Sequence, residues 1–573
     1  MFDGNTRTSF VLHAYLLLGC GDMPAVAKLM RMKGHNGLYS CRFCKIRGVR
    51  IPGARGNALY TPLDRSTHPE AGDTPRYDPA ALPLRTHDEM LRQALEVDLA
   101  SGTRAETLSR DYGINETPIL AALPSVRLDL SFPVEFMHLV WLNLIPNLVL
   151  LYTGRYKDLD QGTGLYEFAA AVWEQIGRAT AASGSTMPSA FGARVPNLAK
   201  DKTYMIAETW CIWTLHIAPV VLRGRFENDK YYHHFMELVR LLRICVQLEL
   251  TDADVQEIRE GFCSWVQKFE KYFYQYDPDR LSTCVTTVHG LLHIADSIER
   301  MGPVGCYWSF LMERFCSSLR PAITSRRNPY ASIDRYVLDR TLIDQVRLLN
   351  NLNGRNRTFH EQKRPVTKKE YHISSYPASV LMRPQRVVPL VKADRERIAR
   401  HLSVRFGANA KAFLQYVPER IETWGKVRRL DDGDTVHARG MVKLRRTDRD
   451  MSFVRYALEE DKYKNRPKRK PEFVRKEYFG QLQYIYILSL PALPKYKQPE
   501  PQTLLLACVT DCAGLSQPNS VGIRYYSGKM GTSQVIDLAS IECVIGRVED
   551  RGQVAIIDRS NEFSRVIIPE DDE

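Results

Sequence analysis

The chain has 573 residues, of which 44% are hydrophobic and 25% are charged, and its net charge is +13. This length predicts three or four domains, and the hydrophobic content is sufficient for sizeable cores. The positive charge favours a polyanionic partner, most simply DNA or RNA, although a basic protein without such a partner is the alternative. The 12 cysteines are isolated along a long chain, which excludes a small disulfide scaffold and fits a reducing compartment better.

No membrane or secretory segment is predicted. The longest apolar stretch, residues 139–152, contains Asn143, Pro146 and Asn147, and it is too short and too interrupted to span a bilayer. The N-terminal apolar run is broken by His13, unlike the core of a signal peptide. We expect a soluble intracellular protein with no membrane partner and no small-molecule substrate, located in the nucleus if its polyanion is DNA.

The N-terminal region predicts a strand followed by a helix. Residues 10–19 are apolar and end in glycine, which is typical of a short buried strand. Pro24 then begins a helix over residues 25–32. Asp22 is therefore expected at the carboxyl end of a strand, where α/β sheets place catalytic groups. A basic loop with two cysteines follows.

The middle of the chain is mainly helical in pattern. Residues 58–85 are rich in Pro, Asp and Thr and predict an exposed connection. Apolar positions at helical spacing then predict further helices, over residues 89–99, 135–151, 203–222, 230–248, 253–275 and 307–319. The helix at 135–151 contains Pro146, which predicts a kink.

The last third changes period. Residues 352–400 form a basic connector dotted with prolines. Alternating apolar residues follow at 482–490, 521–525 and 554–558, separated by turn signals. This pattern predicts a small antiparallel β domain with a basic hairpin or loop.

Two pairs of metal-ligand residues lie far apart in the chain. Cys41 and Cys44 have the two-residue spacing of a zinc knuckle, and His289 and His293 are four apart, on one face of a helix. Each pair alone is also compatible with incidental loop cysteines or polar helix positions. Gly290 stands where a zinc metalloprotease has glutamate. Together the pairs predict one closed, structural zinc site, which leaves no open position for hydrolysis.

Acidic residues adjoin both pairs. Asp22 precedes the cysteines and Glu313 follows the histidines. Isolated acids are usually solvated, but two carboxylates holding divalent ions can promote in-line attack on a phosphodiester. Glu135 and His138 share one face of the most apolar helix; this is either a satisfied histidine or an active-site histidine that contacts a phosphate or an extruded base.

Four basic runs occur, at residues 45–55, 355–369, 443–449 and 462–476. Basic side chains give salt-dependent backbone binding, and interleaved aromatics can stack on bases. Solvated charged faces are the alternative. The candidate nucleic-acid contacts are Lys45, Arg47, Lys468, Arg469 and Lys470.

Three blocks together resemble a known family. They are GDMPAVAKLMRMKGHNGLYSCRFCKI, FPVEFMHLVWLNLIPNLVLLYTG and HGLLHIADSIERMGPVGCYWSFLMERFCSSL. They resemble eukaryotic cut-and-paste transposases of the CACTA/EnSpm-like and fungal Plavaka and KDZ types. The C-terminal strings RDMSFVRY, EYFGQL and IECVIGRVEDRGQVAIIDRS also resemble the tail of the fungal elements.

The resemblance implies a DDE enzyme of DNA transposition that cuts transposable-element ends and joins them to target DNA with Mg²⁺ or Mn²⁺. It implies an α/β RNase H-like core, partial here, with a large all-α insertion and a C-terminal β-rich domain. A homodimer is an expectation from the family. By residue, the resemblance implies Asp22 as second acid, Glu313 as third acid, His138 as insertion histidine, and Cys41, Cys44, His289 and His293 as zinc ligands.

Five regions are expected from these assignments. Residues 1–57 form a partial core with the second acid and the cysteines, and residues 58–280 form the helical insertion. Residues 281–350 return to the core, residues 351–400 are a basic linker, and residues 401–573 are the β-rich domain.

The first acid of the family pattern has no counterpart. Only 21 residues precede Asp22, Asp3 is the acid among them, and a three-strand array does not fit between the two at ordinary strand lengths. We therefore expect an N-terminally truncated relative that cleaves DNA weakly or not at all. The alternative is a domesticated or remnant zinc-containing DNA-binding or scaffold protein without catalysis.

Overall fold

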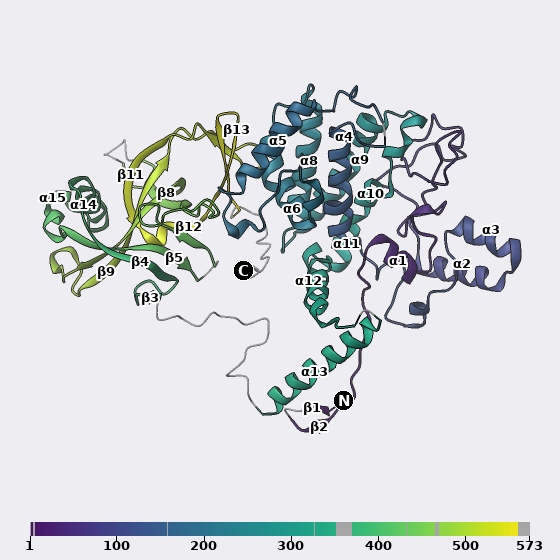
Figure 1. Ribbon diagram of the computed structural model, residues 1–573, viewed down its shortest axis with the longest axis horizontal. Coiled ribbons are helices and arrows are strands. Elements are labelled where there is room, and N and C mark those ends of the chain that lie inside the picture. Colours follow the sequence, from purple (N-terminus) through teal and green to yellow (C-terminus); the bar gives the residue numbers. More distant parts are fainter. Residues whose placement is uncertain are drawn as a thin grey trace. The chain divides into compact units, whose positions relative to one another are not determined.

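The computed structural model describes residues 2–3, 6–157, 159–325, 327–350, 370–430, 433–463 and 469–559. The chain forms two compact units. The first contains Met1–Phe168 and Phe226–Pro365, and the second contains Ala169–Arg225 and Val366–Glu573. The first is largely helical, and the second is built on a curled antiparallel sheet (Figure 1). The fold is therefore mixed α/β, and each unit is described by itself.

The first unit is built from helices and irregular segments. Among its described residues, the one strand pair is the short hairpin of β1 (Phe2–Asp3) and β2 (Thr8–Ser9). Its α-helices are α1 (Met23–Leu29), α2 (His87–Leu99), α3 (Gly102–Tyr112), α4 (Ile145–Tyr152), α8 (Asp229–Cys245), α9 (Asp252–Phe269), α10 (Thr286–His289), α11 (Ile294–Met301), α12 (Phe310–Leu319) and α13 (Pro329–Leu349).

The prediction of a buried strand over residues 10–19 is wrong. Residues 10–17 have no regular structure and are exposed, and none of the described strands pairs with them. An apolar run forms a strand only where a neighbour pairs its backbone groups. Asp22 consequently begins α1 instead of ending a strand, and its Oδ1 accepts a hydrogen bond from Ala25 N at 2.7 Å, as an N-cap does.

The predicted helix over 135–151 is confirmed, with a change of winding. A π-helical segment, η3 (Met137–Leu144), runs directly into α4. Pro146 lies in the first turn of α4. Its missing N–H is tolerated there because the preceding π-helical segment does not need the regular hydrogen bond to the residue four positions earlier. Trp141 is fully buried in this segment, so the helix forms part of the core.

Helices α8 and α9 pack side by side through aromatic side chains. His234 of α8 stacks on Trp265 of α9 with ring centroids 4.4 Å apart, and Trp265 Nε1 donates to His234 O at 3.0 Å. Burial lowers the pKa of His234 to about 3, so this imidazole is neutral and belongs to the core.

The connection at 58–85 has no helix, as predicted, but it is only partly exposed. Leu63, Arg65 and His68 are buried. Glu270, which begins the π-helical segment η7 (Glu270–Tyr274) after α9, accepts hydrogen bonds from Leu63 N at 2.5 Å and Asp64 N at 3.1 Å. The backbone of this long loop is therefore anchored to the helical core.

The second unit has a sheet in the order β11-β9-β8-β5-β4-β3, with β6, β7 and β12 off this path, and a smaller sheet β10-β14-β13. Its strands are β3 (Glu370–His372), β4 (Ser379–Pro389), β5 (Arg420–Arg429), β6 (Thr435–His437), β7 (Phe453–Asp461), β8 (Phe473–Leu490), β9 (Gln502–Cys512), β10 (Arg524–Tyr526), β11 (Met530–Asp537), β12 (Ile541–Val544), β13 (Gly546–Asp550) and β14 (Gln553–Ile557). The predicted antiparallel β region is confirmed.

Helices accompany this sheet. They are α5 (Ala170–Ser183), α6 (Ala207–Ile212), α7 (Ala218–Val221), α14 (Lys392–Phe406) and α15 (Ala410–Phe413). The sequence did not predict α14, because its basic composition hides a narrow apolar stripe. Ile398, Ala399 and Leu402 of that stripe are buried against the sheet. Of the helices in the described ranges, none has the length and apolarity needed to cross a bilayer.

Glu270 predicts a pH dependence of stability. Burial raises its pKa from 4.5 to about 7. The folded state therefore binds its proton more tightly than the unfolded state. Its contribution to stability is present below pH 4.5 and is lost as the pH rises to about 7, by up to about 3 kcal/mol.

Urea unfolding of the wild type and of Glu270→Gln at pH 5 and pH 8 tests this. The loss of stability between these pH values should be smaller in the variant. An equal loss in both proteins would contradict the assignment.

Candidate metal centre

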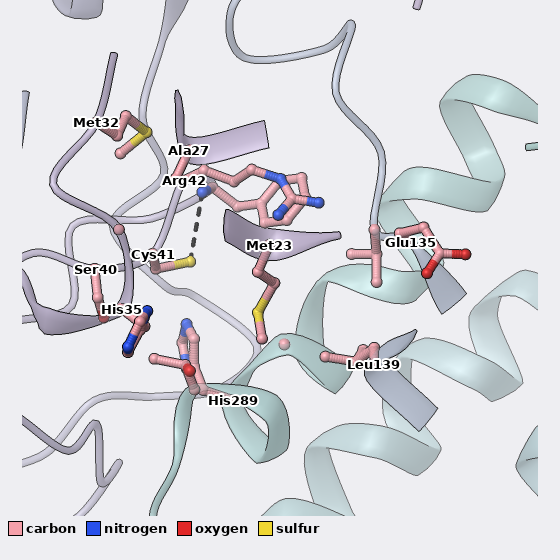
Figure 2. A pocket seen from close by; sticks show the side chains of 15 residues that line it. Met23, Ala27, Met32, His35, Ser40, Cys41, Arg42, Glu135, Leu139 and His289 are labelled. Carbon is pink, nitrogen blue, oxygen red and sulfur yellow. Dashed lines mark hydrogen bonds between the residues drawn. The ribbon is translucent and has the colours of Figure 1, made fainter. Parts of the chain in front are cut away.

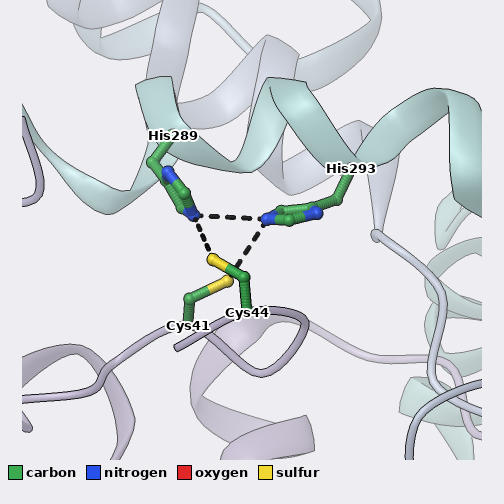
Figure 3. Close-up of side chains that lie close together, drawn as sticks. All are labelled: Cys41, Cys44, His289 and His293. Atoms are coloured by element: carbon green, nitrogen blue, oxygen red, sulfur yellow. Dashed lines mark hydrogen bonds between the residues drawn. The ribbon is translucent and has the colours of Figure 1, made fainter. Parts of the chain in front are cut away.

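Four buried side chains from two distant segments form a compact cluster in the first unit. Cys41 and Cys44 lie in the irregular loop after α1. His289 ends α10, and His293 ends the 3-10 turn η9 (Gly290–His293). Figure 3 shows the two thiols and two imidazoles converging from opposite sides. The structure thus brings together the two half-sites that the sequence predicts.

The separations suit tetrahedral coordination. The Sγ atom of Cys41 lies 3.4 Å from Nε2 of His293, and the Sγ atom of Cys44 lies 3.2 Å from Nε2 of His289. The two Nε2 atoms are 3.2 Å apart. Zinc bonds of about 2.3 Å to sulfur and about 2.0 Å to nitrogen give tetrahedral edges of roughly 3.3–3.8 Å. The cluster can therefore bind a metal ion such as zinc.

Neighbouring side chains hold both halves of the cluster. The Phe43 ring stacks on His293 at 4.8 Å. Arg85 donates from Nε to Cys41 O at 3.0 Å, which fixes the cysteine loop. A Cβ atom at Gly290 would lie 2.9 Å from Leu139 Cδ1, so glycine lets the histidine turn approach η3. No spacing pattern in the sequence predicts these contacts, so Phe43 and Arg85 were not among the predicted site residues.

The two thiols differ in acidity. Burial raises the pKa of Cys41, but the hydrogen bond with Cys44 and the charges of His293 and His289 outweigh it, so this pKa lies well below its ordinary value. The same hydrogen bond, together with burial, raises the pKa of Cys44. The pair thus favours one thiolate, the form that coordinates metal, and binding a cation displaces the remaining proton.

A second polar group surrounds His138. Its Nδ1 donates to Glu135 Oε2 at 2.6 Å, and its Nε2 lies 3.3 Å from Glu313 Oε1. Glu135 is buried and also accepts from Ser309 N at 2.7 Å. Glu135 therefore connects the start of η3 to the start of α12, and α12 carries Glu313. The side chain of Glu313 is 56% exposed, so this group opens to solvent.

Asp22 belongs to the same neighbourhood. The hydrogen bond to Glu135 raises the pKa of His138 despite partial burial, and the negative charges of Glu135, Glu313 and Asp22 raise it further. Their carboxylates do not converge with His138 into a second compact metal cluster; in the described part of the chain, only the Cys/His group meets that condition.

A small cavity of about 60 Å³ is lined by Cys41 and His289 of the cluster and by Glu135 of the His138 group. Figure 2 shows Met23, Arg42, Glu135, Leu139 and His289 around it. At roughly 10–15 Å³ for one water, this space admits a few water molecules. Residues of both groups therefore line one cavity of the first unit.

The predicted nucleic-acid residues have different surroundings. Lys45 forms an ion pair with Glu89 at 3.0 Å, and Arg47 is half-buried. Arg469 and Lys470 are exposed between β7 and β8, with the Arg469 guanidinium 4.9 Å from the centre of the Tyr463 ring. Lys468, the fifth predicted contact, lies outside the described residues.

Comparisons with known proteins do not assign the chain: no protein-family model matches it, and no curated protein matches it. Any function of this chain is therefore inferred from its sites.

The Cys/His cluster predicts one zinc ion per chain. Cys44→Ser and His293→Ala should lose stoichiometric zinc and lower the thermal midpoint of unfolding by roughly 10 °C, because each removes a ligand that joins distant segments. Metal analysis and absorption spectra after cobalt substitution provide the measurement. Cys306→Ser, at an exposed cysteine outside the cluster, is the control. Full zinc content in His293→Ala would contradict the assignment.

The contacts of His138 predict which neighbouring glutamate raises its pKa more when divalent ions are absent. A raised folded pKa means that the charged pair stabilises the protein at low pH, and this stabilisation is lost as the pH rises through the folded value. Glu135→Gln should lower the pKa of His138 more than Glu313→Gln, because the bond to Glu135 is the largest cause. Histidine NMR titration, assigned with His138→Gln, measures both shifts. A larger effect of Glu313→Gln would refute this order.

Proposed function

We propose that this chain is a zinc-containing DNA-binding protein of the DDE transposase class, with metal-dependent DNA strand cleavage and transfer as its activity. The observation that carries the proposal is the meeting of His138 with Glu313 in the neighbourhood of Asp22. These residues come from three distant parts of the chain, and they include the two acids and the histidine of the resembled blocks.

The proposed role of zinc is structural. Two cysteines and two histidines complete a tetrahedral shell and leave no position for substrate. The cluster joins the loop after α1 to the segment before α12, and these elements carry Asp22 and Glu313. This connection supports the proposal that a helical insertion separates the two segments that carry the acids, as in the resembled family.

Asp22 and Glu313 are the proposed ligands for Mg²⁺ or Mn²⁺. Carboxylate oxygens suit these ions, and phosphate oxygens of bound DNA would supply further ligands. When bound, such ions activate a water or hydroxyl and stabilise the leaving oxygen. Both acids also make contacts within the protein, because Asp22 caps α1 and Glu313 meets His138, so we expect cleavage by this chain to be weak.

His138 is the proposed contact to DNA. With Nδ1 held by Glu135, the protonated ring directs its Nε2–H towards the open side occupied by Glu313. Donation to a phosphate oxygen or an extruded base would be charge-assisted. The buried Glu135 is therefore a positioning residue for His138.

Exposed basic residues support DNA binding by the second unit. Arg469 and Lys470 lie on the connection between β7 and β8, and the Arg469 guanidinium lies beside the aromatic ring of Tyr463. Cations beside an aromatic ring fit a nucleic-acid backbone with unstacked bases. Because we propose DNA as the partner, we also propose that the protein is located in the nucleus.

A second candidate is a DNA-binding or scaffold protein without catalysis. The acids already have other roles: Asp22 caps α1 and Glu313 contacts the imidazole of His138. This observation favours a site retained for structure.

Cleavage of supercoiled plasmid by the purified chain, with Mg²⁺ or Mn²⁺, separates these functions. We expect weak nicking that falls at least ten-fold in Asp22→Asn and Glu313→Gln, while Glu106→Gln, an exposed acid on α3, retains it. DNA affinity, measured across a salt series, should change little in all three variants.

Nicking that persists in both Asp22→Asn and Glu313→Gln would contradict the assignment of these acids as ligands of the catalytic ions. Salt-dependent DNA binding without any nicking would establish the second candidate, and the absence of DNA binding would refute both.

A further inference from the structure

Residues 131–135, here called the approach segment, lead into the helix that carries His138. All five are buried, and the last of them, Glu135, accepts hydrogen bonds from His138 N at 2.7 Å and from His138 Nδ1 at 2.6 Å. The backbone groups of a buried segment need hydrogen-bond partners. The residues that supply these partners therefore determine where Glu135, and with it the imidazole of His138, is held.

The cysteine loop supplies two of these partners through Arg42. Its guanidinium donates from Nη2 to Pro133 O at 2.6 Å and from Nε to Phe132 O at 3.3 Å. Arg42 stands between Cys41 and Cys44 in the sequence. Its backbone would therefore be fixed on both sides when the two thiolates coordinate an ion.

A stack of three groups extends this contact to the histidines. The Arg42 guanidinium lies 4.6 Å from the centre of the Phe43 ring, and the Phe43 ring stacks on His293 with centroids 4.8 Å apart. A cation over an aromatic face is attracted to it. The direction of the guanidinium therefore depends on His293 as well as on the cysteines.

The histidine half of the cluster reaches the approach segment through Ser297 of α11. Its buried Oγ donates to His293 O at 2.9 Å and accepts a hydrogen bond from Val134 N at 3.1 Å. A buried group that loses its hydrogen-bond partner remains desolvated. One hydroxyl thus ties the backbone of a candidate metal ligand to the residue before Glu135.

The chain before Asp22 contacts the same segment. Gly19 N donates to Ser131 O at 2.8 Å, and a Cβ atom at Gly19 would lie 2.7 Å from Phe132 Cε1. The approach segment is therefore in contact with both halves of the metal cluster and with the chain that leads to α1.

An ion would change the strength of the connection on which these contacts depend. In the cluster, Cys41 meets His293 and Cys44 meets His289 through thiol hydrogen bonds, and thiols are weak donors and acceptors. Coordinate bonds to zinc are much stronger and fix the ligand positions closely. Because the approach segment is bonded to both halves, its position should respond to the ion.

We propose that a metal ion in the Cys/His cluster sets the orientation of His138, and that Arg42 and Ser297 are the positioning residues that transmit this effect through the approach segment. The site that is proposed to contact DNA would then be regulated by metal occupancy. This consequence rests on the function proposed above, whereas the coupling itself is measurable without DNA.

NMR of the full chain with isotope-labelled histidine, without DNA and with Zn²⁺ as the metal, tests the coupling. With zinc bound, the Nδ1–H of His138 should give a resolved resonance, because its hydrogen bond to buried Glu135 slows exchange with water. Removal of zinc by a chelator should abolish this resonance. The Nε2–H of His234, which lies 3.1 Å from Trp265 O, is the internal reference and should persist in both states.

Two substitutions separate the transmission from the metal site. Arg42→Gln and Ser297→Ala should each retain one zinc ion per chain and lose the His138 resonance, because each removes one connection to the approach segment. The matched control is Ser109→Ala, at a buried serine of α3 whose Oγ bonds Asn115, and it should retain the resonances of both His138 and His234.

A His138 resonance that persists after zinc removal would overturn the proposal, and one that persists in both zinc-loaded variants would overturn the role of Arg42 and Ser297. Loss of the His234 resonance together with that of His138 would overturn the coupling in favour of general unfolding. Loss of zinc from both variants would mean that these residues support the cluster itself, which also overturns their transmitting role. Failure of DNA binding or nicking would contradict only the proposed function, because this test contains no DNA.

Discussion

The convergence of Cys41, Cys44, His289 and His293 is the constraint on which the arrangement of the first unit depends. Within the cluster, Cys44 contacts His289, 245 positions further along the chain, and Cys41 contacts His293, 252 positions further along. A connection between such distant residues restricts the unfolded chain far more than a local turn does. Because the cysteine loop follows α1 and the histidine turn precedes α12, an ion bound at this cluster would hold the segments that carry Asp22 and Glu313 together.

Glu135 makes a second connection beside the first. Its buried carboxylate accepts from Ser309 N and from His138 Nδ1, and this hydrogen bonding outweighs burial and lowers the pKa of Glu135. A buried carboxylate with several donors is costly to break, because the unpaired group would remain desolvated. The cluster and Glu135 together explain how an open, solvent-facing Glu313 still meets an imidazole encoded far upstream.

The sequence predicted the regular elements that local patterns specify. The helices at 89–99 and 135–151 and the antiparallel β region were foreseen, because apolar periodicity reports which face is buried. Periodicity failed where the structure depends on a neighbouring element. Residues 10–19 have the composition of a strand, but no described strand lies beside them. Helix α14 was missed because only three of its apolar side chains are buried against the sheet. The burial of Leu63, Arg65 and His68 was also unforeseen, since Glu270 anchors this loop by accepting hydrogen bonds from two of its backbone amides.

The chemistry of the metal cluster follows from the sequence alone, because ligand type and short spacing are local properties of Cys41-x-x-Cys44 and His289-x-x-x-His293. The basic character of the chain and the class of secondary structure in each region also follow from the sequence. The tertiary structure was needed to show that the two pairs meet and that Glu313 faces His138 while the other side of α12 faces solvent. These outcomes depend on packing between residues more than 100 positions apart, and no local pattern encodes which distant surfaces come into contact.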